Sequence, residues 1–267
     1  MKKLVTILVV ISFTSCVSKK INTTVGESDA TKISYAPLWG AVYMQKASEY
    51  KALCLQAYNI AFEKLDSYVK QSSSKPFAVI TDIDETVLDN SPYTVHQALK
   101  AAQYSDDSWK EWTAKTDCDT VPGALSFFKY ASSKNVEVYY ISNRLQAEAS
   151  QTVANLKKWG FPNADEAHLL LKTTSSSKDA RRASIKEKYN VLLYFGDNLG
   201  DFSGIFDHQS NEQRDALVKQ NVNEFGSRFI VLPNAMYGEW QGALLRYNYK
   251  LSQKEQKDTI ENSLKKY

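Results

Sequence analysis

Four short apolar runs constrain the fold of this chain more than any other feature. They are rich in β-branched or aromatic residues and show no clean alternation of apolar and polar positions. The runs span 77–81, 136–141, 191–195 and 229–232. Strands that are buried on both faces of a parallel sheet have this pattern. The sequence therefore predicts a parallel sheet that is covered on both sides.

Helical stretches accompany these runs. Apolar residues recur every three or four positions over 37–69, which predicts one long amphipathic helix before the first run. Further helical patterns span 123–133, 145–159 and 178–189. Strands that alternate with helices predict an α/β fold with a doubly wound, Rossmann-like parallel sheet.

The segment 93–120 does not follow this alternation. It lies between the first run and the next helix, and it contains Trp109 and Trp112. We interpret it as a small, mainly helical cap inserted after the first strand, over the carboxyl edge of the sheet. At 267 residues, the chain is long enough for one large domain or for a domain with a subdomain, and we assign 34–267 to one domain that includes this cap.

The N-terminus predicts export. Residues 1–15 contain a positive start and then an apolar stretch too short to span a bilayer, which are the marks of a signal peptide. A small residue directly before Cys16 resembles the lipobox of bacterial lipoproteins, in which the Cys is lipid-modified. The alternative is an ordinary signal peptide with an incidental Cys16. We expect a flexible tether over 16–33 and a lipid-anchored protein in the bacterial cell envelope, at the outer membrane.

Charge and cysteine content set further limits. Cleavage before Cys16 removes two Lys residues and no acid, so the formal net charge of +3 falls by two and the mature chain is nearly neutral. We therefore expect no nucleic acid polymer as a partner. Export permits a disulfide between Cys54 and Cys118, but Cys54 lies in a helical pattern that favours a buried thiol. The sequence leaves the oligomeric state open, a homo-oligomer included.

Polar side chains that could take part in catalysis or binding follow three of the runs or lie in the helix before the third. They are Asp82, Asp84, Ser142, Asn143, Arg144, Lys178, Asp197 and Asp201. In open α/β folds, ligands bind beyond the carboxyl ends of the strands. We therefore expect four acids, a hydroxyl group and a lysine to lie together at one edge of the sheet.

This set of side chains indicates metal-assisted chemistry. Carboxylates that are held together repel one another unless a cation or proton is present, and ligands that offer only oxygen suit Mg²⁺. Along an extended backbone, Asp82 and Asp84 point to the same side, so one can attack while the other handles a proton. A carboxylate nucleophile that forms an aspartyl-phosphate is established chemistry, and Lys178 would hold such a nucleophile. The alternative is that these Asp and Asn residues only form turns.

The same residues resemble a known superfamily. "DIDETVLDN" at Asp82, the hydroxyl of Ser142, Lys178 and "GDNLGDF" are similar to the four motifs of the haloacid-dehalogenase-like (HAD) superfamily. With "VPGAL", "ISNR", "SSKDAR" and "LPNAMYGEW", the chain resembles the class C acid phosphatases of the lipoprotein e family, also called lipoprotein 5′-nucleotidases. The resemblance covers about 38–245 and implies a HAD-like sheet.

The resemblance implies roles for the acids. Asp82 would be the nucleophile and a Mg²⁺ ligand. Asp84 would be the general acid and base, and would offer its backbone carbonyl to the metal. Asp197 would be a further ligand, and Asp201 would support the metal through water.

The resemblance also implies how substrate is held. Ser142 and Lys178 would hold the phosphoryl group, with Asn143 and Arg144 beside it. Substrates of the family include nucleoside monophosphates, and aromatic side chains at Tyr93, Trp109 and Tyr237 would contact the nucleoside. Every base can stack on an aromatic ring through its π-face, so such a contact does not depend on which base is present. The alternative for Trp109 is that it packs inside the cap.

These patterns together predict a Mg²⁺-dependent acid phosphatase that hydrolyses phosphomonoesters, with nucleoside 5′-monophosphates as expected substrates. Asp84 favours ester hydrolysis over dehalogenation, because a leaving alkoxide benefits from an acid and a leaving halide does not. The alternative from another class is a non-catalytic surface lipoprotein that binds nucleotides or another ligand.

Overall fold

A five-stranded parallel sheet forms the centre of the molecule. The computed structural model describes residues 29–267, so the predicted signal peptide, Cys16 and residues 17–28 of the predicted tether lie outside the described residues. Every neighbouring pair of strands in this sheet is parallel. In spatial order the strands are β5 (Leu169–Lys172), β4 (Glu137–Leu145), β1 (Phe77–Thr81), β6 (Asn190–Gly196) and β7 (Phe229–Val231). The predicted doubly wound parallel fold is confirmed.

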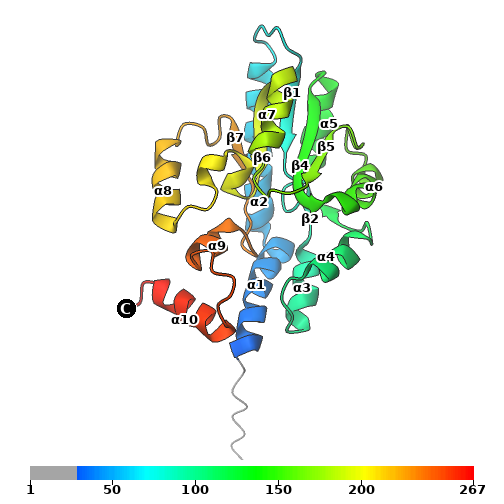
Figure 1. Cartoon of the computed structure of the whole chain (residues 1–267). Coiled ribbons are helices and arrows are strands. Elements are labelled where there is room, and N and C mark those ends of the chain that lie inside the picture. The colour runs from blue at the N-terminus through cyan, green and yellow to red at the C-terminus, as the bar shows by residue number, and fades with distance from the viewer. Residues whose placement is uncertain (1–28) are drawn as a thin grey trace, which may run out of the picture.

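Helices cover both faces of this sheet, as Figure 1 shows. One face packs against α2 (Ser48–Tyr68), α5 (Ala124–Ser133) and α6 (Ala149–Trp159), and α7 (Asp179–Lys188) covers the other. Successive residues of β1 alternate between the two cores: Val79 belongs to the first, and Ala78 and Ile80 to the second. Because both faces of the sheet are buried, the sequences of its strands are continuous apolar runs.

The structure adds one strand to the predicted set and extends another well beyond its predicted end. Strand β5 was not predicted, because its four residues are too few to show a period. Strand β4 runs to Leu145, with an irregularity in its pairing between Ser142 and Leu145. Ser142, Asn143 and Arg144, which we expected just beyond this strand, are therefore among its last residues.

The first helical segment is also different. Instead of one helix over 37–69, there are two, α1 (Asp29–Lys46) and α2, separated by Ala47, whose ψ of 127° is extended. Because α1 begins at Asp29, the predicted tether is wrong over 29–33. Pro37 lies inside α1 rather than at its start. The break lets α1 leave the sheet and pack against α3 and α10.

The cap is mainly helical. It consists of α3 (Ser91–Leu99) and α4 (Asp106–Thr113), and a small antiparallel pair closes its base, β2 (Leu88–Asp89) with β3 (Asp119–Thr120). This pair was not predicted, because two-residue strands leave no pattern. Figure 1 shows that the cap and α1 lie beyond the same end of the sheet as α9 (Glu239–Leu244) and α10 (Gln253–Ser263).

Shorter elements complete the chain between β4 and β7. Helix α8 (Asn211–Gln220) lies before β7, and three single-turn 3₁₀ helices occupy Gln146–Glu148, Leu199–Asp201 and Gly204–Phe206. Cys54 and Cys118 are both buried and free, so the buried-thiol interpretation is confirmed. Within the described residues, none of the helices combines the length and the apolar character that a membrane span requires.

Tyr58 supplies a test of how α2 supports the loop after β1. Its hydroxyl donates to the backbone oxygen of Thr86 at 2.7 Å, and both residues are buried. Tyr58→Phe should lower the free energy of unfolding by about 1–3 kcal/mol, because the Thr86 carbonyl loses its buried partner. Urea denaturation measures this change. Tyr249→Phe, at a side chain that is 73% exposed, is the control and should stay within about 0.5 kcal/mol. Equal midpoints for the two variants would contradict the prediction.

Candidate active site

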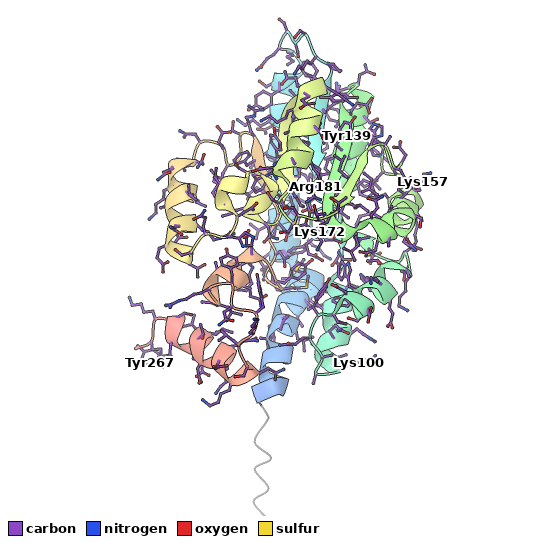
Figure 2. The ribbon with its side chains drawn as sticks, viewed as in Figure 1. Lys100, Tyr139, Lys157, Lys172, Arg181 and Tyr267 are labelled. Carbon is purple, nitrogen blue, oxygen red and sulfur yellow. The ribbon has the colours of Figure 1, made fainter. Side chains whose placement is uncertain are left out.

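The candidate site lies where β1, β4 and β6 end. Asp82 follows β1 directly, and its backbone N–H donates to the oxygen of Phe195 in β6 at 2.9 Å, which continues the sheet pairing by one residue. Lys178 precedes α7, and Asp197 follows β6. Arg181 of α7, labelled in Figure 2, donates to the backbone oxygens of Ser142 in β4 at 2.7 Å and of Leu170 in β5 at 3.4 Å. The expectation that these residues meet at one edge is correct because the five strands of the central sheet run in the same direction.

Lys178 joins two of the predicted acids. Its ammonium contacts Oδ1 of Asp82 and lies 2.7 Å from Oδ1 of Asp201. All three side chains are less than a tenth exposed. Ion pairs in such a dry place are strong only when both partners are present, and removal of one leaves a buried charge.

One lysine does not neutralise the whole cluster. Burial raises the pKa of Asp82 to about 7; Lys178 opposes this rise, and Asp201 and Asp84 add to it. Burial, followed by the charges of Asp201 and Asp82, also raises the pKa of Asp197 well above its ordinary value. Burial lowers the pKa of Lys178, but its two carboxylate partners outweigh this and raise it overall. A further positive charge would therefore stabilise this cluster of carboxylates.

Three of these carboxylates could share one metal ion. Asp82, Asp197 and Asp201 each offer an oxygen, and the three oxygens lie within 4.8 Å of one another. A donor set made only of carboxylate oxygens fits a hard divalent cation such as Mg²⁺. The side chain of Asp84 is not part of this cluster. Its predicted role through the backbone carbonyl stays a prediction.

Neighbouring groups fix the positions of these ligands. The side-chain amides of Asn198 and Asn234 donate to Oδ2 of Asp197 at 2.7 and 2.8 Å. Arg182 donates to the backbone oxygen of Asp201 at 2.8 Å. A Cβ atom on Gly196 would lie 2.3 Å from the Cβ of Asp201, so only glycine allows this close approach.

Asp84 lies in a different electrostatic environment. The buried guanidinium of Arg144 forms an ion pair with it, donating from Nη2 at 2.7 Å and from Nε at 3.0 Å to Oδ1. The hydroxyl of Ser142 donates to Oδ2 at 3.2 Å, and Nδ2 of Asn90 donates to Oδ1 at 2.9 Å. Two carboxylates that are two residues apart thus have different partners, a lysine with acids for Asp82 and an arginine for Asp84. Such a separation suits two chemical roles.

The residues predicted to hold the phosphoryl group contact different partners. Lys178 contacts the nucleophile candidate, as expected. Ser142 and Arg144 are directed to Asp84, and Arg144 also donates to Thr152 at 3.1 Å. Asn143 lines the pocket and accepts from Arg181 at 2.7 Å. The predicted roles of these residues toward substrate stay predictions.

A pocket of about 920 Å³ opens above these acids. Its lining includes the predicted aromatic residues Tyr93, Trp109 and Tyr237, together with Asp82 and Lys178. Trp109 also packs edge-to-face against Tyr93, with 5.0 Å between ring centroids. Trp109 therefore packs inside the cap and also lines the pocket, and its predicted contact with a nucleoside stays a prediction.

Sequence reasoning missed the amides around the site. Asn90, Asn198 and Asn234 contact the carboxylates of Asp84 or Asp197. Asn234 could have been found, because it lies just past the end of β7 and the rule about strand ends applies to it. Asn90 lies only six residues after Asp84, but no local pattern predicts that the turn between them brings its amide back to that carboxylate.

Comparisons with known proteins fit this geometry. A family model described as HAD superfamily, subfamily IIIB (acid phosphatase) matches residues 2–240. The chain belongs to this family. The structure is also similar to the class C acid phosphatase from Bacillus anthracis, with a TM-score of 0.85 and 38% identity over 90% of this chain and 100% of that chain. A second structure of that enzyme, with tungstate bound, has a TM-score of 0.86 and 38% identity over 88% and 99% of the two chains. The resemblance inferred from the motifs is confirmed.

More distant relatives of this HAD family member occur in plants. A stem 31 kDa glycoprotein of Glycine max is 28% identical over 59% of this chain and 58% of its own length. Acid phosphatase 1 of Solanum lycopersicum is 26% identical over 47% of this chain and 51% of its own length. The chain thus spans less than two thirds of these curated relatives.

The raised pKa of Asp82 predicts how metal-free stability changes with pH. Its pKa is about 7 in the folded chain and 3.8 ordinarily, so the folded chain binds more protons between these values. Folding stability must then fall as pH rises from about 4 to 7, by up to about 1.4 kcal/mol per pH unit for one carboxyl group.

Asp82→Asn should remove this contribution, so that in EDTA the variant gains stability relative to the wild type as pH rises. Thermal unfolding from pH 4 to 8 measures the difference, and Mg²⁺ at pH 7 should raise the wild-type midpoint by binding the folded state. Parallel pH profiles of the two proteins would contradict the prediction.

Proposed function

We propose that this protein is a Mg²⁺-dependent phosphatase that hydrolyses phosphomonoesters through an aspartyl-phosphate on Asp82. The observation that carries the proposal is the pair of acids after β1. Asp82 contacts Lys178 among the carboxylates that could hold a metal, and Asp84, two residues on, is held by Arg144. Binding alone does not require a nucleophile beside a separately held acid, so this arrangement favours catalysis over a non-catalytic binding protein.

The side chains divide the reaction between them. An oxygen of Asp82 attacks phosphorus, and Lys178 keeps that carboxylate in place and balances the charge of the phosphoryl group. Asp84 gives a proton to the ester oxygen as the bond between phosphorus and that oxygen breaks. In the second half, Asp84 takes a proton from water, which attacks the aspartyl-phosphate and releases phosphate.

The metal fits the residues present. Asp82, Asp197 and Asp201 would hold it, with the backbone carbonyl of Asp84 as the proposed fourth contact. When bound, Mg²⁺ supplies positive charge that screens the repulsion between anionic substrate and anionic site. The related class C enzyme was crystallised with tungstate, a tetrahedral oxyanion of the same shape class as phosphate, which supports an oxyanion site in this fold.

We infer that nucleoside 5′-monophosphates are the substrates. Tyr93, Trp109 and Tyr237 line the pocket above Asp82, and aromatic rings bind every base through its π-face. A volume of about 920 Å³ is within the range for small-molecule sites. The chain would act at the cell envelope, anchored in the outer membrane by a lipid on Cys16. The short apolar segment before Cys16 supports this location.

Asp82→Asn tests the mechanism. The amide cannot attack phosphorus, so release of phosphate from p-nitrophenyl phosphate should fall by at least about 10⁴-fold, the scale of losing a catalytic nucleophile. EDTA should abolish wild-type activity, and added Mg²⁺ should restore it. Full activity of the variant would contradict the aspartyl-phosphate mechanism. A wild-type protein that binds nucleotides and releases no phosphate would favour the binding-protein alternative.

Trp109→Ala tests the nucleoside contact. Loss of one base-stacking partner costs about 1–3 kcal/mol, so KM for a nucleoside 5′-monophosphate should rise roughly 5- to 150-fold. KM for glycerol phosphate, which has no base, should change little and serves as the matched control. Equal changes for both substrates would show that Trp109 only supports the cap.

A further inference from the structure

The side chain of Asn90 lies between the cap and Asp84. It is fully buried, directly before α3. Its Nδ2 donates to Oδ1 of Asp84 at 2.9 Å. On the other side, its Oδ1 accepts from the indole Nε1 of Trp112 at 2.8 Å and from the thiol of Cys118 at 3.2 Å. One amide therefore connects a carboxylate of the site with two separate residues of the cap.

The cap determines which way this amide faces. An indole nitrogen is a donor and never an acceptor, so the oxygen of Asn90 must face Trp112. The NH₂ group then faces Asp84, where it can donate. With the amide reversed, two oxygens would meet at Asp84 and two donors at Trp112. The indole of Trp112 thus fixes a donor against the carboxylate.

The backbone holds Asn90 from the opposite side. Its N–H donates to Oε1 of Glu85 at 2.8 Å, and Glu85 has a φ of +59°, in the left-handed region. The N–H of Glu85 in turn donates to the oxygen of Leu88 at 2.8 Å. The chain from Asp84 to Asn90 is therefore a closed turn that directs the side chain of Asn90 back to Asp84.

These contacts treat the two oxygens of Asp84 differently. Oδ1 accepts from Asn90 and from two nitrogens of Arg144, at 2.7–3.0 Å. Oδ2 accepts longer contacts, at 3.2 Å, from Ser142 and from Nε of Arg144. An oxygen with three donors has no free lone pair for a proton, so the proton that Asp84 gives to the ester oxygen is carried by Oδ2.

We propose that Asn90 is a positioning residue for Asp84, and that the cap orients this acid through Trp112 and Asn90. The inference rests on the proposed function, in which Asp84 protonates the leaving group. Arg144 supplies charge from β4, whereas Asn90 sets the rotation of the carboxylate from the loop that leads into the cap.

Leaving-group dependence tests this role. A good leaving group such as p-nitrophenolate departs without a proton, and an alkoxide requires one. Asn90→Asp keeps the oxygen that faces Trp112 and replaces the donor that faces Asp84 with an oxygen. Its kcat/KM should fall about 10- to 100-fold for glycerol phosphate and less than about threefold for p-nitrophenyl phosphate. The ratio kcat/KM excludes the later hydrolysis of the aspartyl-phosphate, so Asp84 acts here only as the acid.

Two further variants complete the experiment. Trp112→Phe removes the indole N–H and keeps an aromatic ring, so it should give the same pattern with a smaller loss, and it tests the inference even if Asn90→Asp does not fold. Thr113→Val is the matched control, because its buried hydroxyl joins the same helix to Glu148 at 2.9 Å rather than to Asn90 or Asp84. It should lower the unfolding temperature and affect all esters equally.

The outcomes distinguish the positioning role of Asn90 from the proposed phosphatase function. Equal losses on all esters for both Asn90→Asp and Trp112→Phe, with an active wild type, would overturn the positioning role and leave the phosphatase function intact. A leaving-group-dependent loss in Thr113→Val would also overturn it, since any loosening of the cap would then produce the pattern. A wild-type protein that hydrolyses none of the esters would overturn both.

Discussion

The crowding of carboxylates at the carboxyl edge of the sheet is the constraint on which the rest of the site depends. Asp82, Asp197 and Asp201 are brought within reach of one another by strands that run in the same direction. Burial and mutual repulsion raise the pKa of Asp82 and Asp197, and Lys178 offsets only part of this. A divalent cation would lower that electrostatic cost, which explains why such a cluster can persist in a stable fold.

The separation of the two acids after β1 follows from the same parallel arrangement. Asp82 continues the sheet toward Lys178, whereas Asp84 turns toward Arg144 at the end of β4. Asp84 accepts hydrogen bonds from a buried guanidinium, whereas Asp82 contacts a lysine within an acidic cluster. The fold thus gives two neighbouring residues of one type two environments, and the chemistry that we propose uses both.

The cap contributes side chains to the pocket and to the contacts of Asn90. It supplies Tyr93 and Trp109 to the pocket and, through Trp112, a contact to Asn90. A segment that lines the pocket and reaches Asp84 through Asn90 could, in the proposed reaction, link substrate binding to the position of the acid.

The sequence by itself determined the parallel sheet, the edge where the site lies, and the placement of Asp82 and Asp197, since residues at the ends of parallel strands must meet. Local patterns were too short to reveal β5 or the break at Ala47. Only the tertiary structure decided that Arg144 pairs with Asp84 and that Trp112 orients Asn90. Those contacts join segments far apart in the chain, and their hydrogen-bond geometry depends on how the cap packs against the sheet.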